Sequence, residues 1–287
     1  MTRFIYLSDT HWGPGIGDYK LQPKYDQQLP GILAALRSWI DEHGAVDFVL
    51  HGGDLIHETS EDSITAAADL LDLSVPVYLC LGNHDLTAPG ALDEWLRLAP
   101  QLFGDEGPNY AVETADCRVH VMPNHYGPTP FLWEKVQEPY FLPAQLEAVE
   151  DRIASRPGIP QLLLTHSPTH GIEPDQTGFD EVFHQPPDSF TTTVTDLADK
   201  HGLACVLGAH SHANMVKVHH GVHYITTSSL VETPFEFKIF EVGNEGLVME
   251  THSLWDRVDF RADYDWSSTF VQGRARDRGF ARPPMTT

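Results

Sequence analysis

The sequence predicts an α/β fold built as one large domain. Three short apolar runs, at residues 4–7, 46–50 and 75–81, have the length and composition of strands buried in a parallel sheet. Two segments with apolar residues at helical spacing, about 24–43 and 60–73, separate them. Because strand–helix–strand crossovers are right-handed, the three strands run parallel and end at one edge. A chain of 287 residues with 41% hydrophobic residues can bury a core around such a sheet.

The first strand leads into Ser8-Asp9-Thr10-His11. Since side chains alternate along an extended chain, we expect Asp9 and His11 to point to the same side and to bring a carboxylate and an imidazole together. The same spacing is also a frequent exit from a strand into a turn, so the pair alone does not establish a metal site. The glycine-rich stretch 13–17 is expected to form a turn that borders a pocket.

The other two strands of this run also end in polar residues. His51-Gly52-Gly53-Asp54 places two glycines before one aspartate, which gives the space that a carboxylate bridging two cations requires. In Gly82-Asn83-His84-Asp85, the Asn83 oxygen can bind a cation, and His84 can bind a cation or carry a proton. Asp85 is expected to hold the His84 imidazole in one tautomer. The alternative is a polar turn that closes the strand.

The middle of the chain changes towards antiparallel β-structure. A helix is predicted over 89–98, followed by a hairpin-like pair of strands at 109–114 and 118–122. The irregular stretch 123–143 is dense in proline and aromatic residues, and we expect it to roof the site, with His125 and Tyr126 nearest to it. Two alternatives are equally compatible with this composition: a hydrophobic plug, or a contact between subunits. The second alternative would make the protein a homo-oligomer.

Two later strands deliver further imidazoles. A helix over 144–155 precedes the strand 160–165, which ends at His166, and the strand 203–208 is followed by His210 and His212. These last two rings fall on one side if the chain is extended, or diverge to two cations if a turn begins between them.

The remaining segments are predicted to lie outside the site. Antiparallel strands are expected at 215–218, 223–227, 235–242 and 247–251, and the charged segment 256–287 is expected as a surface arm or a loose terminus. No site role is expected for eight other histidines, which lack convergent partners: His57, His170, His184, His201, His219, His220, His223 and His252.

The charge of the chain restricts its partners. It has 18 Lys and Arg against 41 Asp and Glu, a formal net charge of -23. Such a charge repels polyanions, so we expect neither a nucleic-acid polymer nor an anionic membrane surface as a partner. A small anionic substrate is compatible with this charge if metal ions supply local positive charge.

The cysteines and the N-terminal pattern indicate a cellular compartment. Cys80, Cys117 and Cys205 form no Cys-x-x-Cys pair, and two of them lie in apolar strand-like runs, which indicates buried reduced thiols. The chain starts with a core-strand pattern without a basic leader, and no apolar run approaches the length of a membrane span. We therefore expect a soluble cytoplasmic protein.

Nitrogen and oxygen ligands without sulfur follow the predicted strand ends at seven positions: Asp9, His11, Asp54, Asn83, His166, His210 and His212. They are too many for one tetrahedral zinc ion and fit two borderline cations that share one carboxylate. Water at the remaining coordination positions would supply a nucleophile.

The ordered blocks resemble the pattern of the calcineurin-like metallophosphoesterase family: Asp-x-His, Gly-Asp, Gly-Asn-His-Asp, His, and Gly-His-x-His. In the last block, Gly208 is followed by Ala209 instead of directly by histidine. The blocks cover about residues 4–212, and the resemblance implies a four-layer αββα sandwich with two mixed β-sheets. We expect the catalytic domain to span residues 1–255. The resemblance also implies two metal ions, Mn, Fe or Zn, one held by Asp9, His11, Asp54 and His212 and the other by Asp54, Asn83, His166 and His210.

The same resemblance implies roles for two further residues and a class of substrate. His84 would contact the substrate phosphate or protonate the leaving oxygen, with Asp85 orienting it. The stretch 53–59 lacks the arginine of the family's protein phosphatases, and the third block ends in Asp85 instead of glutamate. The chain is therefore similar to the branch that contains class III cyclic nucleotide phosphodiesterases and glycerophosphodiesterases.

The expected activity is hydrolysis of a small-molecule phosphodiester, of the cyclic nucleotide or glycerophosphodiester type, by a hydroxide that bridges the two metals. A diester carries one negative charge and needs fewer cationic side chains than a monoester, which fits the missing arginine. The alternatives are a phosphomonoesterase acting on a small metabolite and a non-catalytic scaffold on the same fold. A scaffold is expected to lack some ligands or His84, and a nuclease is disfavoured by the net charge.

Overall fold

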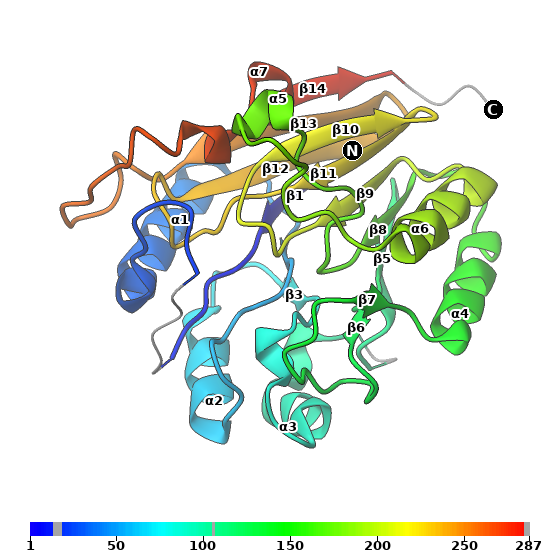
Figure 1. Cartoon of the computed structure of the whole chain (residues 1–287), viewed down its shortest axis with the longest axis horizontal. Helices are drawn as coiled ribbons and strands as arrows, with labels where there is room; N and C mark the ends of the chain where they lie inside the picture. Colours follow the sequence, from blue (N-terminus) through cyan, green and yellow to red (C-terminus); the bar gives the residue numbers. More distant parts are fainter. Residues whose placement is uncertain (14–18, 105–106, 284–287) are drawn as a thin grey trace.

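Two mixed β-sheets packed face to face form the centre of the protein (Figure 1). The computed structural model describes residues 1–13, 19–104 and 107–283. Of the glycine-rich turn expected at 13–17, only Gly13 lies within these ranges. The predicted α/β fold is confirmed.

The first sheet has six strands in the order β14-β13-β12-β1-β2-β3. Its parallel part is the strand–helix–strand run predicted from the sequence, made of β1 (Thr2–Leu7), α1 (Leu29–His43), β2 (Phe48–His51), α2 (Glu61–Leu70) and β3 (Val77–Leu79). Its antiparallel part consists of β12 (Glu236–Gly243), β13 (Gly246–Ser253) and β14 (Gly279–Arg282).

The second sheet also has six strands, in the order β10-β11-β9-β8-β5-β4. They are β4 (Tyr110–Glu113), β5 (Arg118–Val121), β8 (Gln161–Leu164), β9 (Cys205–Gly208), β10 (Met215–His219) and β11 (Val222–Thr226). The hairpin of β4 and β5 is confirmed. The strand β11 pairs antiparallel with β10, as predicted, but parallel with β9.

Helices cover the outer faces of both sheets. Besides α1 and α2, they are α3 (Ala91–Leu98), α4 (Pro143–Ala154) and α6 (Asp188–His201), with the short helices α5 (Pro174–Thr177) and α7 (Ala275–Arg278). The 3-10 turns are η1 (Asp26–Gln28), η2 (His84–Leu86), η3 (Pro100–Leu102) and η4 (Thr269–Gln272). None of the helices in the described ranges is long and apolar enough to cross a membrane.

Side-chain contacts define the layers. Between the sheets, Tyr6 Oη donates to Gly208 O at 2.6 Å, while on the opposite face of the first sheet Trp39 of α1 packs against Phe237. In β8, Leu162 and Leu164 belong to the core between the sheets and Leu163 belongs to a separate cluster that includes apolar residues of α4 and α6. Alternate side chains of β8 therefore pack into two different cores, one on each face of the second sheet. This gives the layer order helix, sheet, sheet, helix.

The C-terminal segment differs from the loose terminus expected at 256–287. The strand β14 pairs with β13 at the edge of the first sheet, and Val271 and Asp277 are fully buried. The Asp277 carboxylate accepts hydrogen bonds from the backbone N–H groups of Val216 and Arg274, both at 2.8 Å. The segment is held because its buried charge is fully paired, which its polar composition does not reveal.

The three cysteines are buried and unpaired, in agreement with the prediction.

Candidate metal centre

The polar residues at the strand ends meet at one edge of the two sheets. Five of them adopt the left-handed backbone conformation: Asp9 (φ 55°), His11 (φ 45°), Asp54 (φ 53°), His210 (φ 63°) and His212 (φ 54°). Asp9 and His11 therefore converge through a strained turn, and not through the strand alternation that predicted them. Each such residue costs on the order of 1–3 kcal/mol and is found mainly at functional sites.

The backbone of neighbouring strand ends holds this strain. Asp9 N donates to Gly53 O and His11 N donates to Asp54 O, both at 3.0 Å. These bonds attach the turn after β1 to the turn after β2, so the side chains of both turns share one position in space.

Asp9, His11 and His212 form one buried cluster. His212 Nε2 lies 3.4 Å from Asp9 Oδ1 and 3.2 Å from His11 Nε2. His212 Nδ1 lies 2.6 Å from the Glu232 carboxylate, which assigns the proton to Nδ1 and leaves Nε2 as an acceptor. Asp9 Oδ1 is buried and has no hydrogen-bond partner within the described ranges.

Asp54, His166 and His210 form a second cluster, which Asn83 joins. His166 Nδ1 donates to Gly52 O at 2.9 Å, so its Nε2 is an acceptor that faces Asn83 Oδ1 at 3.1 Å. Asp54 Oδ2 lies 3.4 Å from His166 Nε2 and 3.8 Å from His11 Nε2, which places this carboxylate between the clusters. His210 and His212 thus diverge, the second of the two predicted alternatives.

The donor set fits two cations. Acceptors face each other in both clusters, and the stabilising element between two acceptors is a proton or a metal ion. The set consists of imidazole nitrogens, carboxylates and one carboxamide without sulfur, which suits Zn, Fe or Mn. The residues present are therefore suited to hold cations, and the Asp54 carboxylate lies between the two clusters.

Electrostatics show that this site attracts positive charge. Burial lowers the pKa of His212, but Asp9 and Glu232 outweigh it and raise the pKa to about 10. Burial likewise opposes protonation of His166, whereas Asp54 raises the pKa to about 9. For Asp9, burial raises the pKa and attraction to His212 lowers it, with a net pKa below the ordinary value. Two bound cations would take the place of these protons.

Glycines give the close packing that the clusters require. Gly53 has φ 108°, and a Cβ there would lie 2.5 Å from His166 Nδ1 and 2.8 Å from Gly82 N. A Cβ at Gly82 would collide with the Asp54 carboxylate. The predicted reason for the glycines before Asp54, close approach of the backbone, is confirmed at Gly53.

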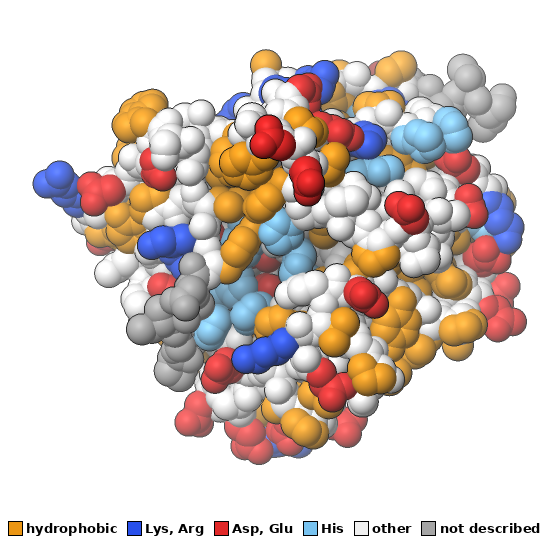
Figure 2. Space-filling model, in the orientation of Figure 1, with side chains coloured by type: hydrophobic (Ala, Val, Ile, Leu, Met, Phe, Trp, Pro, Cys, Tyr) orange, Lys and Arg blue, Asp and Glu red, His pale blue; other side chains and the backbone are white. Residues whose placement is uncertain are grey.

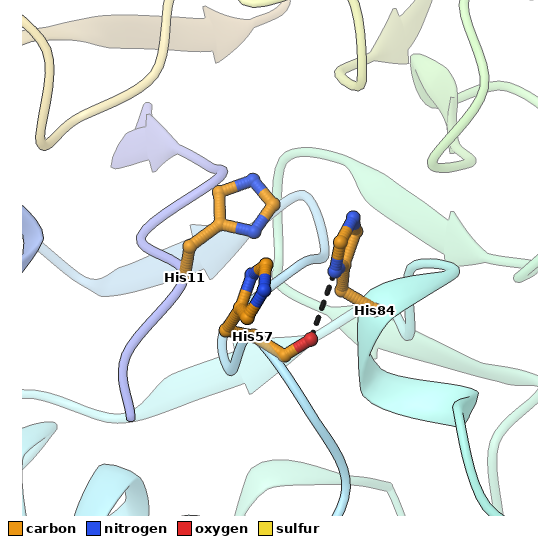
Figure 3. A group of neighbouring side chains, drawn as sticks. All are labelled: His11, His57 and His84. Atoms are coloured by element: carbon orange, nitrogen blue, oxygen red, sulfur yellow. Dashed lines mark hydrogen bonds between the residues drawn. The ribbon is translucent and has the colours of Figure 1, made fainter. Parts of the chain in front are cut away.

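His84 lies beside the clusters and is half-buried. Its backbone N–H donates to Asp54 Oδ1 and its Nδ1 donates to the carbonyl oxygen of His57, both at 2.8 Å (Figure 3). Asp85 does not orient the ring as predicted, because its buried carboxylate accepts the N–H groups of Gly82 (2.9 Å) and Ile56 (3.1 Å). Asp85 therefore shapes the turn that carries Asn83, and the His57 carbonyl sets the His84 tautomer.

The stretch 123–143 folds over the site through a short pair of strands, β6 (His125–Tyr126) and β7 (Pro139–Tyr140). The Tyr126 ring lies 5.8 Å from the His210 ring. His125 instead points to Gln145, at 2.8 Å from its Nε2, and its Nδ1 accepts the N–H of Phe131. The structure therefore brings Tyr126, but not His125, to the site.

A hollow of about 210 Å³ opens over the clusters, and Figure 2 shows histidines gathered in it. An adjoining hollow of about 330 Å³ includes Tyr126 and shares Tyr19, Gln137, His184 and His210 with the first. A larger hollow, about 550 Å³, lies elsewhere and contains none of the cluster residues. Residues that the sequence analysis did not assign also line the hollow over the clusters: Tyr19, Lys24, His57, Trp133, Gln137 and His184.

The chain matches known proteins at the level of family and fold. The family model described as calcineurin-like phosphoesterase matches residues 2–214. A search of the curated proteins finds no match.

Solved structures with this fold include GAP50, the anchor in the inner membrane complex of Plasmodium (TM-score 0.61, 12% identity, 92% of this chain and 88% of that chain). They also include the purple acid phosphatase PPD1 of yellow lupin (0.61, 16%, 100% and 57%) and the phosphopantetheinyl hydrolase of Mycobacterium tuberculosis (0.52, 15%, 79% and 90%). At these identities the likeness shows the fold alone. Because the family model spans every strand end that carries the two clusters, the protein belongs to the calcineurin-like phosphoesterase family.

Proposed function

We propose that the protein hydrolyses a small-molecule phosphodiester at a two-metal centre. Membership of the family indicates a metal-dependent phosphoester hydrolase. The observation that carries the two-metal proposal is the pair of clusters on either side of the Asp54 carboxylate. In them, acceptors face each other at 3.1 Å (His166 Nε2 and Asn83 Oδ1) and 3.4 Å (His212 Nε2 and Asp9 Oδ1). When bound, two such cations activate water and neutralise charge on the phosphoryl oxygens.

The residues divide into two ligand sets in this proposal. Asp9, His11 and His212 hold one ion, and Asn83, His166 and His210 hold the other, with Asp54 between them. Glu232 and the Gly52 carbonyl keep the Nε2 atoms of His212 and His166 directed at the ions by binding their Nδ1 atoms.

His84 is the proposed proton donor to the leaving oxygen. The His57 carbonyl binds its Nδ1–H, so its Nε2 is the atom available to the substrate. The ring lines the same hollow, stacks on His57 at 4.9 Å and lies tilted at 4.7 Å from Trp133. It belongs to neither of the two clusters with carboxylates, although it also groups with the rings of His11 and His57. With its Nδ1–H bound by a backbone carbonyl and its Nε2 in the hollow, the ring is placed to exchange a proton with the substrate.

Two features support a diester substrate. No arginine is among the described residues that line the hollow over the clusters, which suits the single negative charge of a diester. The adjoining hollow, which shares four residues with the first, gives room for a second ester arm. The proposal extends to the branch of cyclic nucleotide phosphodiesterases and glycerophosphodiesterases that the sequence resembles.

Phosphomonoester hydrolysis is the second candidate, because Lys24 lines the hollow and is able to neutralise the extra charge of a monoester. The test is a comparison of kcat/KM for bis(p-nitrophenyl) phosphate and p-nitrophenyl phosphate after reconstitution with Mn, Fe or Zn. A preference for the diester is expected. A preference for the monoester with any of these metals would contradict the proposal.

A further inference from the structure

We infer that Lys24 forms a second anion-binding subsite beside the metal centre and that the substrate is a phosphodiester with a negatively charged group on one ester arm. This inference rests on the proposed function and narrows its substrate class.

The Lys24 side chain is buried but has spare hydrogen-bonding capacity. It is only 8% exposed, yet it is part of the wall of the hollow over the clusters. Its Nζ lies 3.4 Å from Asp26 Oδ2, longer than a charge-assisted hydrogen bond, and no closer acceptor is found among the described residues. An ammonium group offers three N–H donors, and a buried one is costly unless these are paired. A ligand anion in the hollow would add an acceptor for Lys24 besides Asp26.

Long-range contacts hold Lys24 in this position before any ligand binds. Tyr25 N donates to Val231 O at 2.8 Å, and Thr233 N donates to Pro23 O at 3.1 Å. Lys24 itself forms an isolated antiparallel bridge with Glu232. Because these bonds fix the backbone on both sides, binding an anion does not require ordering of this segment.

Lys24 lies on the side of the hollow that holds His57 and His84. All three residues line the same hollow. Burial, His84 and Lys24 together lower the pKa of His57. Figure 3 shows His57 beside His84 and His11, and the rings of His57 and His84 stack at 4.9 Å. A group bound to Lys24 therefore shares this hollow with His57, His84 and the residues of the two clusters.

Because the whole chain is strongly acidic, a cationic side chain in the hollow matters for binding an anionic ester arm. A formal net charge of -23 repels an anionic arm from most of the surface. Within the hollow over the clusters, Lys24 is the only lysine or arginine among the described lining residues. Recognition of a second negative group beyond the metals therefore depends on Lys24.

The test uses three diesters with the same p-nitrophenolate leaving group and different second arms: ethyl, 2-carboxyethyl and choline. We expect wild-type kcat/KM to be highest for the carboxyethyl ester. Lys24→Met should lower it about 10- to 100-fold for that ester, the range of one charge-assisted hydrogen bond, and change the ethyl and choline esters about twofold or less. Lys24→Arg should restore most of the loss. Lys135→Met is the matched control, since Lys135 is exposed and lines neither hollow.

Two outcomes of the kinetic test would overturn the inference. If Lys24→Met lowered kcat/KM equally for all three esters, the substitution would impair catalysis in general and not recognition of the charged arm. An unchanged kcat/KM for the carboxyethyl ester in Lys24→Met would show that Lys24 does not bind the charged arm.

A binding measurement separates failure of the subsite from failure of the proposed function. 3-Phosphonopropanoate and ethylphosphonate are titrated by calorimetry into the metal-loaded protein, with metal content measured for each variant. Tighter binding of 3-phosphonopropanoate that disappears in Lys24→Met and in a second variant, Lys24→Gln, supports the subsite even if no diester is hydrolysed. An affinity ratio that both variants leave unchanged would overturn it.

Discussion

Glu232→Gln should weaken metal binding, because one carboxylate serves both the metal centre and the Lys24 segment. Oε1 lies 2.6 Å from His212 Nδ1, and Oε2 accepts the N–H groups of Leu21 (2.9 Å) and Gln22 (2.8 Å). Glutamine has one acceptor oxygen, so either the imidazole or the two amides must face an NH₂ donor. An unpaired buried donor costs about 1–3 kcal/mol, and loss of such a ligand-orienting partner lowers metal affinity about 10- to 100-fold.

The assay is competition for Zn²⁺ with a chromogenic chelator, combined with denaturant unfolding of the metal-free protein. Asp277→Asn is the matched control, because Asp277 is also a fully buried carboxylate that accepts two backbone N–H groups but contacts neither cluster. We expect both variants to lose stability and only Glu232→Gln to lose metal affinity. Wild-type affinity in Glu232→Gln, with a stability loss like that of the control, would refute the orienting role.

Three further predictions concern other residues. His84→Ala should retain both ions and lower kcat about 10²- to 10⁴-fold, with the smallest loss for p-nitrophenolate esters; loss of an ion on metal analysis would contradict the acid role. Asp54→Ala should lose binuclear occupancy and activity together, and two ions retained per chain would exclude a bridging role. Burial lowers the pKa of Lys238 to about 7. The folded state therefore binds fewer protons than the unfolded state between that pKa and about 10.4, so the wild-type unfolding free energy should rise with pH in this window by up to about 1.4 kcal/mol per unit, a rise that Lys238→Met should lack.

The strand ends were predictable because buried parallel strands have a local signature. Short apolar runs, helical spacing between them and polar residues after them are all readable over a few residues, and they led to Asp9, Asp54 and His166. The topology rule for crossovers then brought separate motifs to one edge without any structural information. The parallel part of the first sheet and the meeting of its polar strand ends follow from this reasoning, whereas the second sheet and the division of the ligands into two sets were implied by the family resemblance.

Backbone groups account for the error at Asp85. The sequence suggested that the nearest acidic side chain orients His84, but the His57 carbonyl does so, while Asp85 binds two backbone N–H groups. Any residue carries a carbonyl, so residue type does not signal this role. The sequence analysis also expected no site role for His57, because no motif surrounds it. Its ring nevertheless lines the hollow over the clusters.

Lys24 and the C-terminal strand could not be predicted, because their positions depend on pairing across most of the chain. The residues beside Lys24 are held by segments more than 200 positions away, through Glu232 and Val231, and β14 pairs at the sheet edge from residues 279–282. Contacts of this separation leave no periodicity in a sequence window. The metal ligands are thus predictable from local motifs, whereas the residues proposed to select the substrate come from loops positioned by distant segments. Substrate specificity can accordingly change between relatives with the same metal ligands.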